Sequence, residues 1–301
     1  MKVFVAGASG AIGIPLVRAL VTAGHEVTAL TRTAGKEAGL RALGASVTVA
    51  DALNRDALIT AVAAAEPTHV IHQLTALPLD GPRRAADLDA TNRLRIDGTR
   101  NLLEAAVNAR VRRFVVGSFA LLAPREPAAA ATRDAAAAAI RSMEGQVLDA
   151  TKSGAIEGVV LRYGMFYGLE TPSTIAMIDM VRKRRLPVIR GDAGLLPVIH
   201  IDDAVNATVR ALDAPAGRTY DIVDDRAVSL TEIVQAIAAF SGSAPPRTVP
   251  VWLLRLVAPY MVRLVSMRMP LSNAKAKAEL GWQPKYSTLH DGLAAVLRRT
   301  A

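Results

Sequence analysis

Short apolar segments alternate with segments of helical periodicity through the first two-thirds of the chain. Helical boundaries are marked by local signals, since Gly24 follows one helical segment and Asn54 can cap the start of another. Near-continuous apolar strands joined by helices predict an α/β fold, a Rossmann-type, doubly wound parallel sheet covered on both faces. The expected strands are residues 2–7, 26–32, 46–51, 69–74, 112–118 and 158–164, and the expected helices are residues 11–23, 55–65, 89–108 and 134–150.

The regular alternation ends near Gly168, which divides the predicted organisation into two parts. Residues 1–168 form the larger domain, and residues 169–301 form a smaller C-terminal lobe that is interleaved with it. In this second part, short helical segments mix with the strand-like stretches "PVIHI" and "TYDIV". Ser229 and Glu232 have the spacing of a capping box, which predicts a helix that begins immediately after Ser229.

Composition limits the classes of function. The chain has 301 residues, no cysteine and a formal charge of +9, and its basic residues are scattered rather than gathered with aromatic residues. Disulfides, thiolate chemistry and a nucleic-acid partner are therefore not expected. The apolar stretch 249–269 is interrupted by Arg255, Pro259 and Arg263, so no membrane span is expected. We expect a cytoplasmic protein, a monomer or a homodimer, whose positive charge attracts an anionic ligand.

The segment "GASGAIG" contains the clearest ligand-binding motif. Its glycines permit a tight turn between the first strand and the first helix, and they allow the backbone to approach a pyrophosphate at the helix N-terminus. Its position at the start of a strand–helix–strand unit makes the motif specific for a dinucleotide site. The residues of this turn expected to bind the cofactor are Gly7, Gly10, Ala11, Ile12 and Gly13.

The end of the second predicted strand favours NADP over NAD. An NAD site has an acidic residue there for the ribose hydroxyls, but no acid occurs between Val27 and Lys36. Thr31, Arg32 and Lys36 can instead contact the 2′-phosphate of NADP. The alternative interpretation is that Arg32 is only a solvated surface charge.

At these residues the chain resembles an extended short-chain dehydrogenase/reductase of the epimerase/dehydratase kind. The resemblance implies that Asp51 and Ala52 flank the adenine and that Asn92 supports the active-site helix. It also implies that Leu74, Thr75 and Ala76 line the nicotinamide ribose, and that the loop with Tyr163, Met165 and Phe166 passes beside the nicotinamide. The motifs that carry it are "GASGAIG", "VADALNRDAL", "VIHQLTAL", "TNRLRIDGTRNLLEAA", "RRFVVGS", "LRYGMFYG", "VIHIDDAV" and "AKAELGWQP".

The family's catalytic tyrosine and lysine are missing. In such enzymes a Tyr-x-x-x-Lys pair moves the proton of the reaction, whereas here the matching positions hold Ala136 and Ile140. No tyrosine occurs between Ser118 and Tyr163, so a shift of register cannot restore the pair. The resemblance leaves Ser118 to orient the substrate oxygen, and Tyr163 is the nearest candidate proton donor; water is the alternative. No metal site is expected, because no His/Asp/Glu cluster has the required spacing.

The second lobe is rich in leucine, methionine and aromatic residues, for example in "VWLLRLVAPYMVRLVSM". This composition predicts a small-molecule hydrophobic substrate. The sequence thus predicts an NADP-binding domain at residues 1–168 and a substrate-binding lobe at residues 169–301. The predicted function is an NADP-dependent oxidoreductase acting on a bulky, largely apolar carbonyl or enone-like metabolite. The alternatives are a non-redox isomerase, lyase or cyclase on the same fold, and an NADP-sensing regulatory protein without catalysis.

Overall fold

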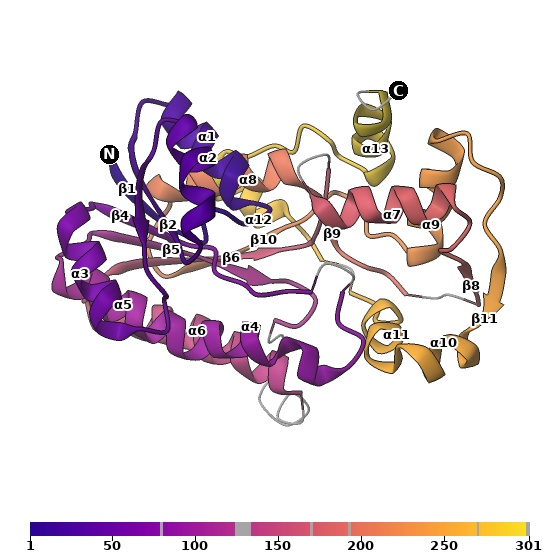
Figure 1. Cartoon of the computed structure of the whole chain (residues 1–301), viewed down its shortest axis with the longest axis horizontal. Helices are drawn as coiled ribbons and strands as arrows, with labels where there is room; N and C mark the ends of the chain where they lie inside the picture. The colour runs from indigo at the N-terminus through magenta and orange to yellow at the C-terminus, as the bar shows by residue number, and fades with distance from the viewer. Residues whose placement is uncertain (79–80, 124–133, 169–170, 192–193, 270, 299–301) are drawn as a thin grey trace.

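A seven-stranded parallel sheet forms the centre of the protein (Figure 1). The computed structural model describes residues 1–78, 81–123, 134–168, 171–191, 194–269 and 271–298. The strand order is β10-β6-β5-β4-β1-β2-β3, so the order reverses next to β1 and leaves a crevice at the carboxyl ends of the strands. The strands are β1 Lys2–Ala6, β2 Glu26–Thr31, β3 Ser46–Val49, β4 His69–His72, β5 Arg113–Phe119, β6 Glu157–Tyr163 and β10 Arg218–Ile222.

Helices cover both faces of this sheet, which confirms the predicted Rossmann-type α/β fold (Figure 1). On one face lie α1 Gly13–Thr22, α2 Glu37–Ala42, α8 Ile201–Arg210 and α12 Ala274–Leu280. On the other face lie α3 Arg55–Ala65, α4 Asp89–Arg93, α5 Thr99–Asn108 and α6 Ala135–Lys152. Their apolar sides and the strands form two buried clusters, one on each side of the sheet.

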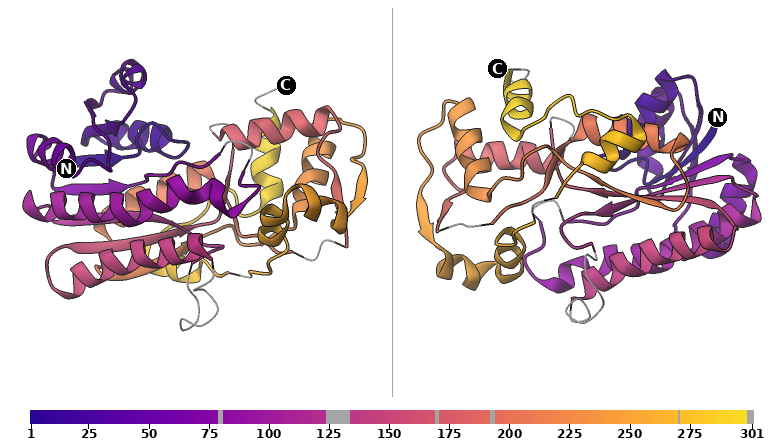
Figure 2. Two further views of the ribbon diagram at one scale, coloured as in Figure 1. Left: turned by 60° about the horizontal axis from the view of Figure 1, so that its bottom comes forward. Right: turned by 180° about the vertical axis from the view of Figure 1, so that it is seen from behind.

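The smaller lobe lies at one end of the sheet (Figures 1 and 2). It contains two short parallel pairs of strands and five helices among the described residues. The pairs are β7 Met165–Tyr167 with β9 Val198–His200, and β8 Val188–Arg190 with β11 Thr248–Pro250. The helices are α7 Pro172–Arg182, α9 Leu230–Phe240, α10 Val251–Val257, α11 Pro259–Val265 and α13 Leu289–Arg298.

The chain passes between the two parts more than once. Strand β10 pairs with β6 in the central sheet, and α8 and α12 cover the sheet, although all three follow residue 168. Trp282 joins these elements, because its indole N–H donates to the backbone carbonyl of Asp203 at 3.0 Å. A single boundary at residue 168 therefore does not separate the two parts, since residues after 168 contribute to both.

The helix expected at residues 89–108 has an irregularity in its middle. Between α4 and α5 the backbone forms a π-helical turn at Leu94–Gly98. Such a turn inserts an extra residue into the helix and is frequently found at functional sites. Arg95, which lies in this turn, is buried.

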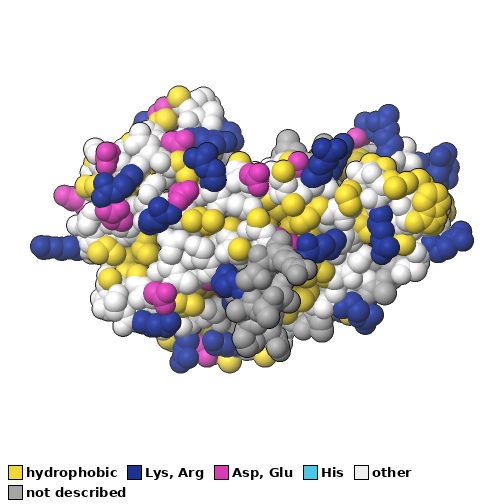
Figure 3. All heavy atoms as spheres, turned by 90° about the horizontal axis from the view of Figure 1, so that it is seen from below, with side chains coloured by type: hydrophobic (Ala, Val, Ile, Leu, Met, Phe, Trp, Pro, Cys, Tyr) yellow, Lys and Arg dark blue, Asp and Glu magenta, His cyan; other side chains and the backbone are white. Residues whose placement is uncertain are grey.

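Charge is not concentrated on the face drawn in Figure 3, where basic side chains are spread among apolar and acidic ones. Apolar side chains gather at the end of the molecule that carries α10, which exposes Trp252, Leu253, Leu256 and Val257. None of the helices in the described part of the chain is long and apolar enough to cross a membrane.

Candidate functional site

The glycine turn between β1 and α1 is pressed against the end of β4. Gly7 has a φ of +89°, and a Cβ added there would lie 2.5 Å from the carbonyl oxygen of Gln73. A Cβ on Gly13 would lie 2.2 Å from the carbonyl oxygen of Gly7, and the Gly10 N–H donates to that same oxygen at 3.0 Å. Glycine is required at Gly7 and Gly13 because backbone occupies the space that a side chain would need.

Helix α1 begins directly after this turn, and the side chain of Ile12 does not cap it. The Ile14 N–H donates to the Gly10 carbonyl at 3.2 Å and Pro15 has no N–H, so an anion is favoured here mainly by the positive end of the helix dipole. Pro15 is the third residue of α1, where its missing N–H costs no helical hydrogen bond. The turn and the helix N-terminus together fit the pyrophosphate of a dinucleotide.

Basic side chains lie beside this turn at the end of β2. Arg32 is exposed, and the Lys36 ammonium lies 3.5 Å from the carbonyl oxygen of Ser9 in the glycine turn. Thr31 is buried, and its hydroxyl lies 3.2 Å from the Ser9 hydroxyl, so it connects the end of β2 to the turn. This arrangement can hold a phosphate group on the adenosine ribose, with Arg32 and Lys36 as the mobile cations.

The residues expected around the adenine lie at the end of β3. Asp51 is exposed, and its carboxylate accepts the N–H of Leu53 at 2.9 Å. Ala52 is buried, and its carbonyl accepts from the Asn101 side chain at 3.0 Å. Because β1, β2 and β3 are parallel neighbours, this loop lies at the same edge of the sheet as the glycine turn.

The residues expected around the nicotinamide ribose follow β4. Leu74 and Ala76 are half-buried and Thr75 is exposed. The Leu74 N–H donates to Nδ1 of His72 at 3.1 Å, and burial lowers the pKa of His72 to about 4, so this histidine is neutral. Its Nε2 then donates to the Thr99 hydroxyl at 2.8 Å. His72 thus has the buried structural role of holding the loop that follows β4.

The positions of the missing tyrosine and lysine are apolar and packed. Ala136 and Ile140 are fully buried on α6, in a cluster with Leu121 and Leu122 after β5 and with Tyr260 and Leu264 of α11. Neither side chain can transfer a proton. In the sequence the single lysine between Ser118 and Tyr163 is Lys152, and its ammonium pairs with Asp149 at the exposed far end of the helix.

Ser118 contacts a buried acid rather than open space. It is 7% exposed, and its hydroxyl donates to Oε1 of Glu144 at 2.6 Å. Arg162 makes two charge-assisted hydrogen bonds to the same carboxylate, at 2.9 and 2.6 Å. The hydroxyl proton of Ser118 is therefore already committed, which revises its expected role from orienting the substrate to joining β5, β6 and α6.

Tyr163 also has a packing role in this structure. It is 3% exposed, and its hydroxyl lies 2.9 Å from the Gln73 amide nitrogen and 2.8 Å from the Thr208 hydroxyl. Thr208 donates to the backbone of Ala204, so Tyr163 must donate to Thr208. Burial raises the pKa of Tyr163 to about 12. These contacts leave the phenol no free direction toward a substrate, which revises the expectation that it is the proton donor.

The residues after Tyr163 lie where the two parts of the protein meet. Phe166 packs on the sheet, with its ring 5.2 Å from that of Tyr163. Met165 is half-buried and contacts both apolar clusters of the smaller lobe. Of the two residues Met165 and Phe166, which were expected beside the nicotinamide, Met165 is therefore the one that faces the apolar region around Ala136 and Ile140.

Sequence reasoning missed a set of buried polar residues around the N-terminal half of α6. Asp134 caps α6 and pairs with Arg263 at 3.1 Å, and the Tyr260 hydroxyl donates weakly to its carboxylate at 3.4 Å. Arg95 is buried on the helix opposite, beside Asn92, which was expected to support the active-site helix, and each of the two has a polar atom without a hydrogen-bond partner. Arg95 could have been noticed from the regular three- and four-residue spacing of the buried positions that surround it, which are Leu88, Thr91, Gly98 and Leu102.

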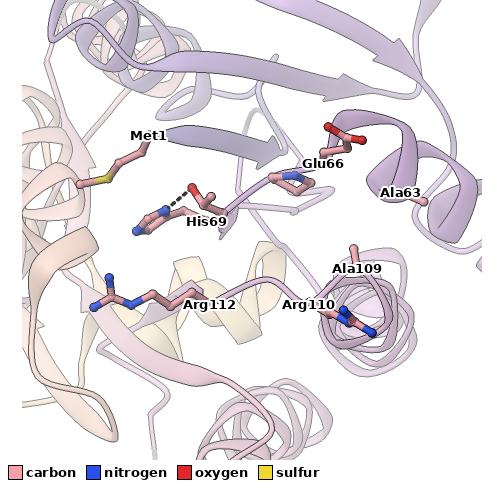
Figure 4. A pocket seen from close by; sticks show the side chains of 9 residues that line it. Met1, Ala63, Glu66, His69, Ala109, Arg110 and Arg112 are labelled. Carbon is pink, nitrogen blue, oxygen red and sulfur yellow. Dashed lines mark hydrogen bonds between the residues drawn. The ribbon is translucent and has the colours of Figure 1, made fainter.

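A cavity of about 620 Å³ lies elsewhere in the protein. It is lined by Met1, Glu66, His69, Ala109, Arg110 and Arg112, among others (Figure 4). These residues lie near the amino ends of β1, β4 and β5, whereas the glycine turn lies at the carboxyl ends. The cavity is therefore not part of the nucleotide site. No group of three or more metal-binding side chains occurs among the residues that the structure describes.

Comparisons with known proteins agree with this geometry. Residues 3–223 match the model of the NAD dependent epimerase/dehydratase family. The chain is 38% identical over 312 residues to a 3-diazoavenalumate denitrifying reductase from a Streptomyces species, covering 97% of this chain and 99% of that protein. It is 26% identical over 262 residues to a 4-hydroxy-2-methyl-3-oxo-4-farnesyl-3,4-dihydroquinoline-1-oxide ketoreductase from Stigmatella aurantiaca, covering 81% and 76%.

The fold is similar to that of the UDP-glucose 4-epimerase from Thermus thermophilus, solved in complex with NAD. The two share a TM-score of 0.80 and 23% sequence identity, over 99% of this chain and 98% of the epimerase. The matched family depends on NAD, and the glycine turn fits a dinucleotide. The chain therefore belongs to the NAD dependent epimerase/dehydratase family, and it is an NAD(P)-dependent oxidoreductase or a related enzyme.

Proposed function

We propose that the protein is an NADPH-dependent reductase of a bulky, largely apolar substrate. The observation that carries this proposal is the combination of a dinucleotide cradle with a buried apolar cluster at the two catalytic positions, Ala136 and Ile140. The nicotinamide supplies the hydride, and the protein contributes binding, orientation and the exclusion of water.

The preference for the phosphorylated cofactor rests on the end of β2. Arg32 and Lys36 stand where an NAD site carries an acid, and both are exposed and free to turn toward a 2′-phosphate. Thr31 keeps the end of β2 against the glycine turn, which supports a position of Arg32 near the adenosine ribose of a bound cofactor. A phosphate that meets two cations gains charge-assisted hydrogen bonds that NAD cannot make.

The apolar character of the substrate rests on the cluster that α11 completes. Leu121, Leu122 and Leu264 surround Ala136 and Ile140, and Met165 reaches the same cluster from β7. A nucleotide sugar would need many polar and charged contacts, whereas this apolar cluster offers mainly leucine and methionine side chains. Ketones, enones or other planar apolar electrophiles fit it better.

The lost proton relay favours one electrophile in particular. Reduction of a ketone creates an alkoxide that must be protonated, and Ala136 and Ile140 cannot do this. Reduction of an arenediazonium ion does not need a proton donor. The hydride takes the ring carbon, the carbon–nitrogen bond breaks and N₂ leaves, so that ArN₂⁺ and NADPH give ArH, N₂ and NADP⁺. The name of the Streptomyces relative, a denitrifying reductase of a diazo acid, supports diazo compounds as the first class to test. Carbonyl and enone substrates remain the second.

The test is stoichiometric NADPH oxidation with three probes: 4-methoxybenzenediazonium, 4-phenylbut-3-en-2-one and 9,10-phenanthrenequinone. Each assay includes a reaction without protein, because NADPH reduces diazonium salts slowly on its own. We expect one NADPH to be consumed for each product molecule, with anisole and N₂ formed from the diazonium probe. If none of the probes oxidises NADPH above the protein-free rate, the reductase proposal fails. Conversion of a probe without NADPH consumption would favour a non-redox isomerase or lyase, and tight NADPH binding without any conversion would favour a regulatory protein.

A further inference from the structure

A positive charge is buried without a negative partner in the part of the chain that the structure describes. Arg95 lies on the π-helical turn Leu94–Gly98 and is only 5% exposed. No carboxylate among the described residues pairs with it, and its Nη1 has no hydrogen-bond partner. Burial lowers the pKa of Arg95 to about 10, so it still carries its charge at neutral pH. A buried charge without a partner destabilises the folded state, and a protein seldom retains one unless a ligand completes the site.

A second unpartnered polar group lies one turn earlier on the same face of the helix. Asn92 is 8% exposed, and its Oδ1 has no hydrogen-bond partner. Residues three apart are neighbours on a helical surface, so the amide and the guanidinium can reach the same ligand. Rotation of the amide by 180° presents its NH₂ group in place of the oxygen, which gives a donor beside the donors of Arg95.

The surroundings place these two residues beside the apolar cluster over Ala136 and Ile140. Arg95 is close enough to Tyr260 of α11 to act on its pKa, and Tyr260 belongs to that cluster. Tyr260 is neutral, since burial raises its pKa to about 12, so it cannot balance the charge. The nearby carboxylate of Asp134 is already used by the N-terminus of α6 and by Arg263. The charge of Arg95 therefore remains open to a ligand.

We propose that Arg95 and Asn92 bind a carboxylate of the substrate, so that the substrate is an apolar organic acid. This inference rests on the proposed reductase function and names the substrate class of the same site. One guanidinium and one amide balance a single negative charge, and the remaining neighbours are apolar, which suits a carboxylate better than a dianionic phosphate. The hydroxyls of a bound ribose are neutral and would leave the charge uncompensated.

Calorimetric titration with two acids and their amides tests the proposal. The probes are trans-cinnamate with cinnamamide, and decanoate with decanamide, each added to protein saturated with NADP⁺. We expect at least one acid to bind at least tenfold more tightly than its amide. Arg95→Met should remove this difference, Arg95→Lys should keep part of it, and Asn92→Ala should reduce it. Arg93→Met is the matched control, because Arg93 is exposed on the same helix.

Thermal unfolding of the free protein separates ligand binding from a structural role. If Arg95 waits for a ligand, Arg95→Met should raise the melting temperature, because an uncharged side chain of similar length replaces an uncompensated charge. A strong fall in the melting temperature would show that Arg95 holds the fold together, and the proposal would be overturned. Equal binding of acid and amide by the wild type, or unchanged binding of the acid by Arg95→Met, would overturn it as well.

The neutral probes distinguish this failure from that of the proposed function. The neutral probes 4-phenylbut-3-en-2-one and 9,10-phenanthrenequinone carry no carboxylate, so their reduction by NADPH tests the reductase activity alone. Reduction of a neutral probe together with carboxylate binding that ignores Arg95 would reject the anion site and keep the reductase. Arg95-dependent binding of an acid without any NADPH oxidation would support the anion site and reject the reductase.

Discussion

Replacing Arg32 by alanine should weaken the proposed preference for NADPH over NADH. Arg32 follows β2 directly and is exposed next to the glycine turn, where a 2′-phosphate of the adenosine ribose would lie. NADH lacks this phosphate, so its affinity should not change. The variant Arg32→Ala should therefore weaken NADPH binding and leave NADH binding as it is.

The size of the expected loss of NADPH affinity follows from the exposure of the two cations, Arg32 and Lys36. A hydrogen bond to a charged group contributes about 1.5–3 kcal/mol, and solvent screening at an exposed site places Arg32 near the lower end. We therefore expect about a tenfold loss of NADPH affinity. Lys36 remains in Arg32→Ala, and its ammonium already reaches the turn at 3.5 Å from the Ser9 carbonyl. The double variant with Lys36→Ala should lose clearly more, and the loss should shrink at high salt.

Titrations of both cofactors by nicotinamide fluorescence at low and high ionic strength provide the measurement. Arg41→Ala is the control, because Arg41 is an exposed cation of α2 that pairs with Glu37. This variant also removes one positive charge, but from a side chain that pairs with a carboxylate of the same helix, so it should leave the affinities for NADPH and NADH unchanged. Equal affinity of the wild type for NADH and NADPH would show that Arg32 does not select NADPH. An equal loss of affinity for both cofactors in Arg32→Ala would show the same.

Three further predictions concern the fold around the site. Burial raises the pKa of Asp224 from its usual 3.8 to about 8, so between these pH values the folded protein holds a proton that the unfolded chain releases. The free energy of unfolding should therefore fall as the pH rises from about 4 to about 8, and urea titrations of Asp224→Asn should lack this fall. Gly13→Ala should abolish cofactor binding in the same titrations, because its Cβ would lie 2.2 Å from a backbone oxygen. Tyr163→Phe should lower the free energy of unfolding by about 1–3 kcal/mol, because it leaves the buried groups that contact the phenol hydroxyl unpaired. Its steady-state turnover should stay within about threefold of the wild type. A loss of turnover of about 100-fold would instead restore Tyr163 as the proton donor.

Local signals predicted most of the helices and strands well. The expected helix 55–65 is α3, and the Asn54 side chain accepts the Ala57 N–H as an N-cap. The capping box of Ser229 and Glu232 is also present at the start of α9. Such features depend on residues a few positions apart, so the sequence contains all the information that they need.

Pairings between distant segments were harder to predict. The stretch "TYDIV" was recognised as a strand, but its place beside β6 in the central sheet depends on residues about sixty positions away. The contacts of Ser118 and Tyr163 were missed for the same reason, because their partners Glu144 and Thr208 come from other elements. Arg95 was missed because an arginine is normally exposed, although the regular spacing of the buried positions around it places it on the buried side of the helix.

The transfer of deuterium from labelled cofactor to product shows whether the protein transfers a hydride. NADPH carrying deuterium on either face of the nicotinamide C4 is incubated with the protein and with the diazonium or the enone probe, whichever oxidises it faster, and the product is analysed by mass spectrometry. The quinone is left out, because its reduced product holds the transferred hydrogen on oxygen and exchanges it with water. The account predicts that one of the two labelled cofactors delivers one deuterium to each product molecule, and that the other delivers none. Product without deuterium from either cofactor would contradict hydride transfer and leave a non-redox reaction on the same fold.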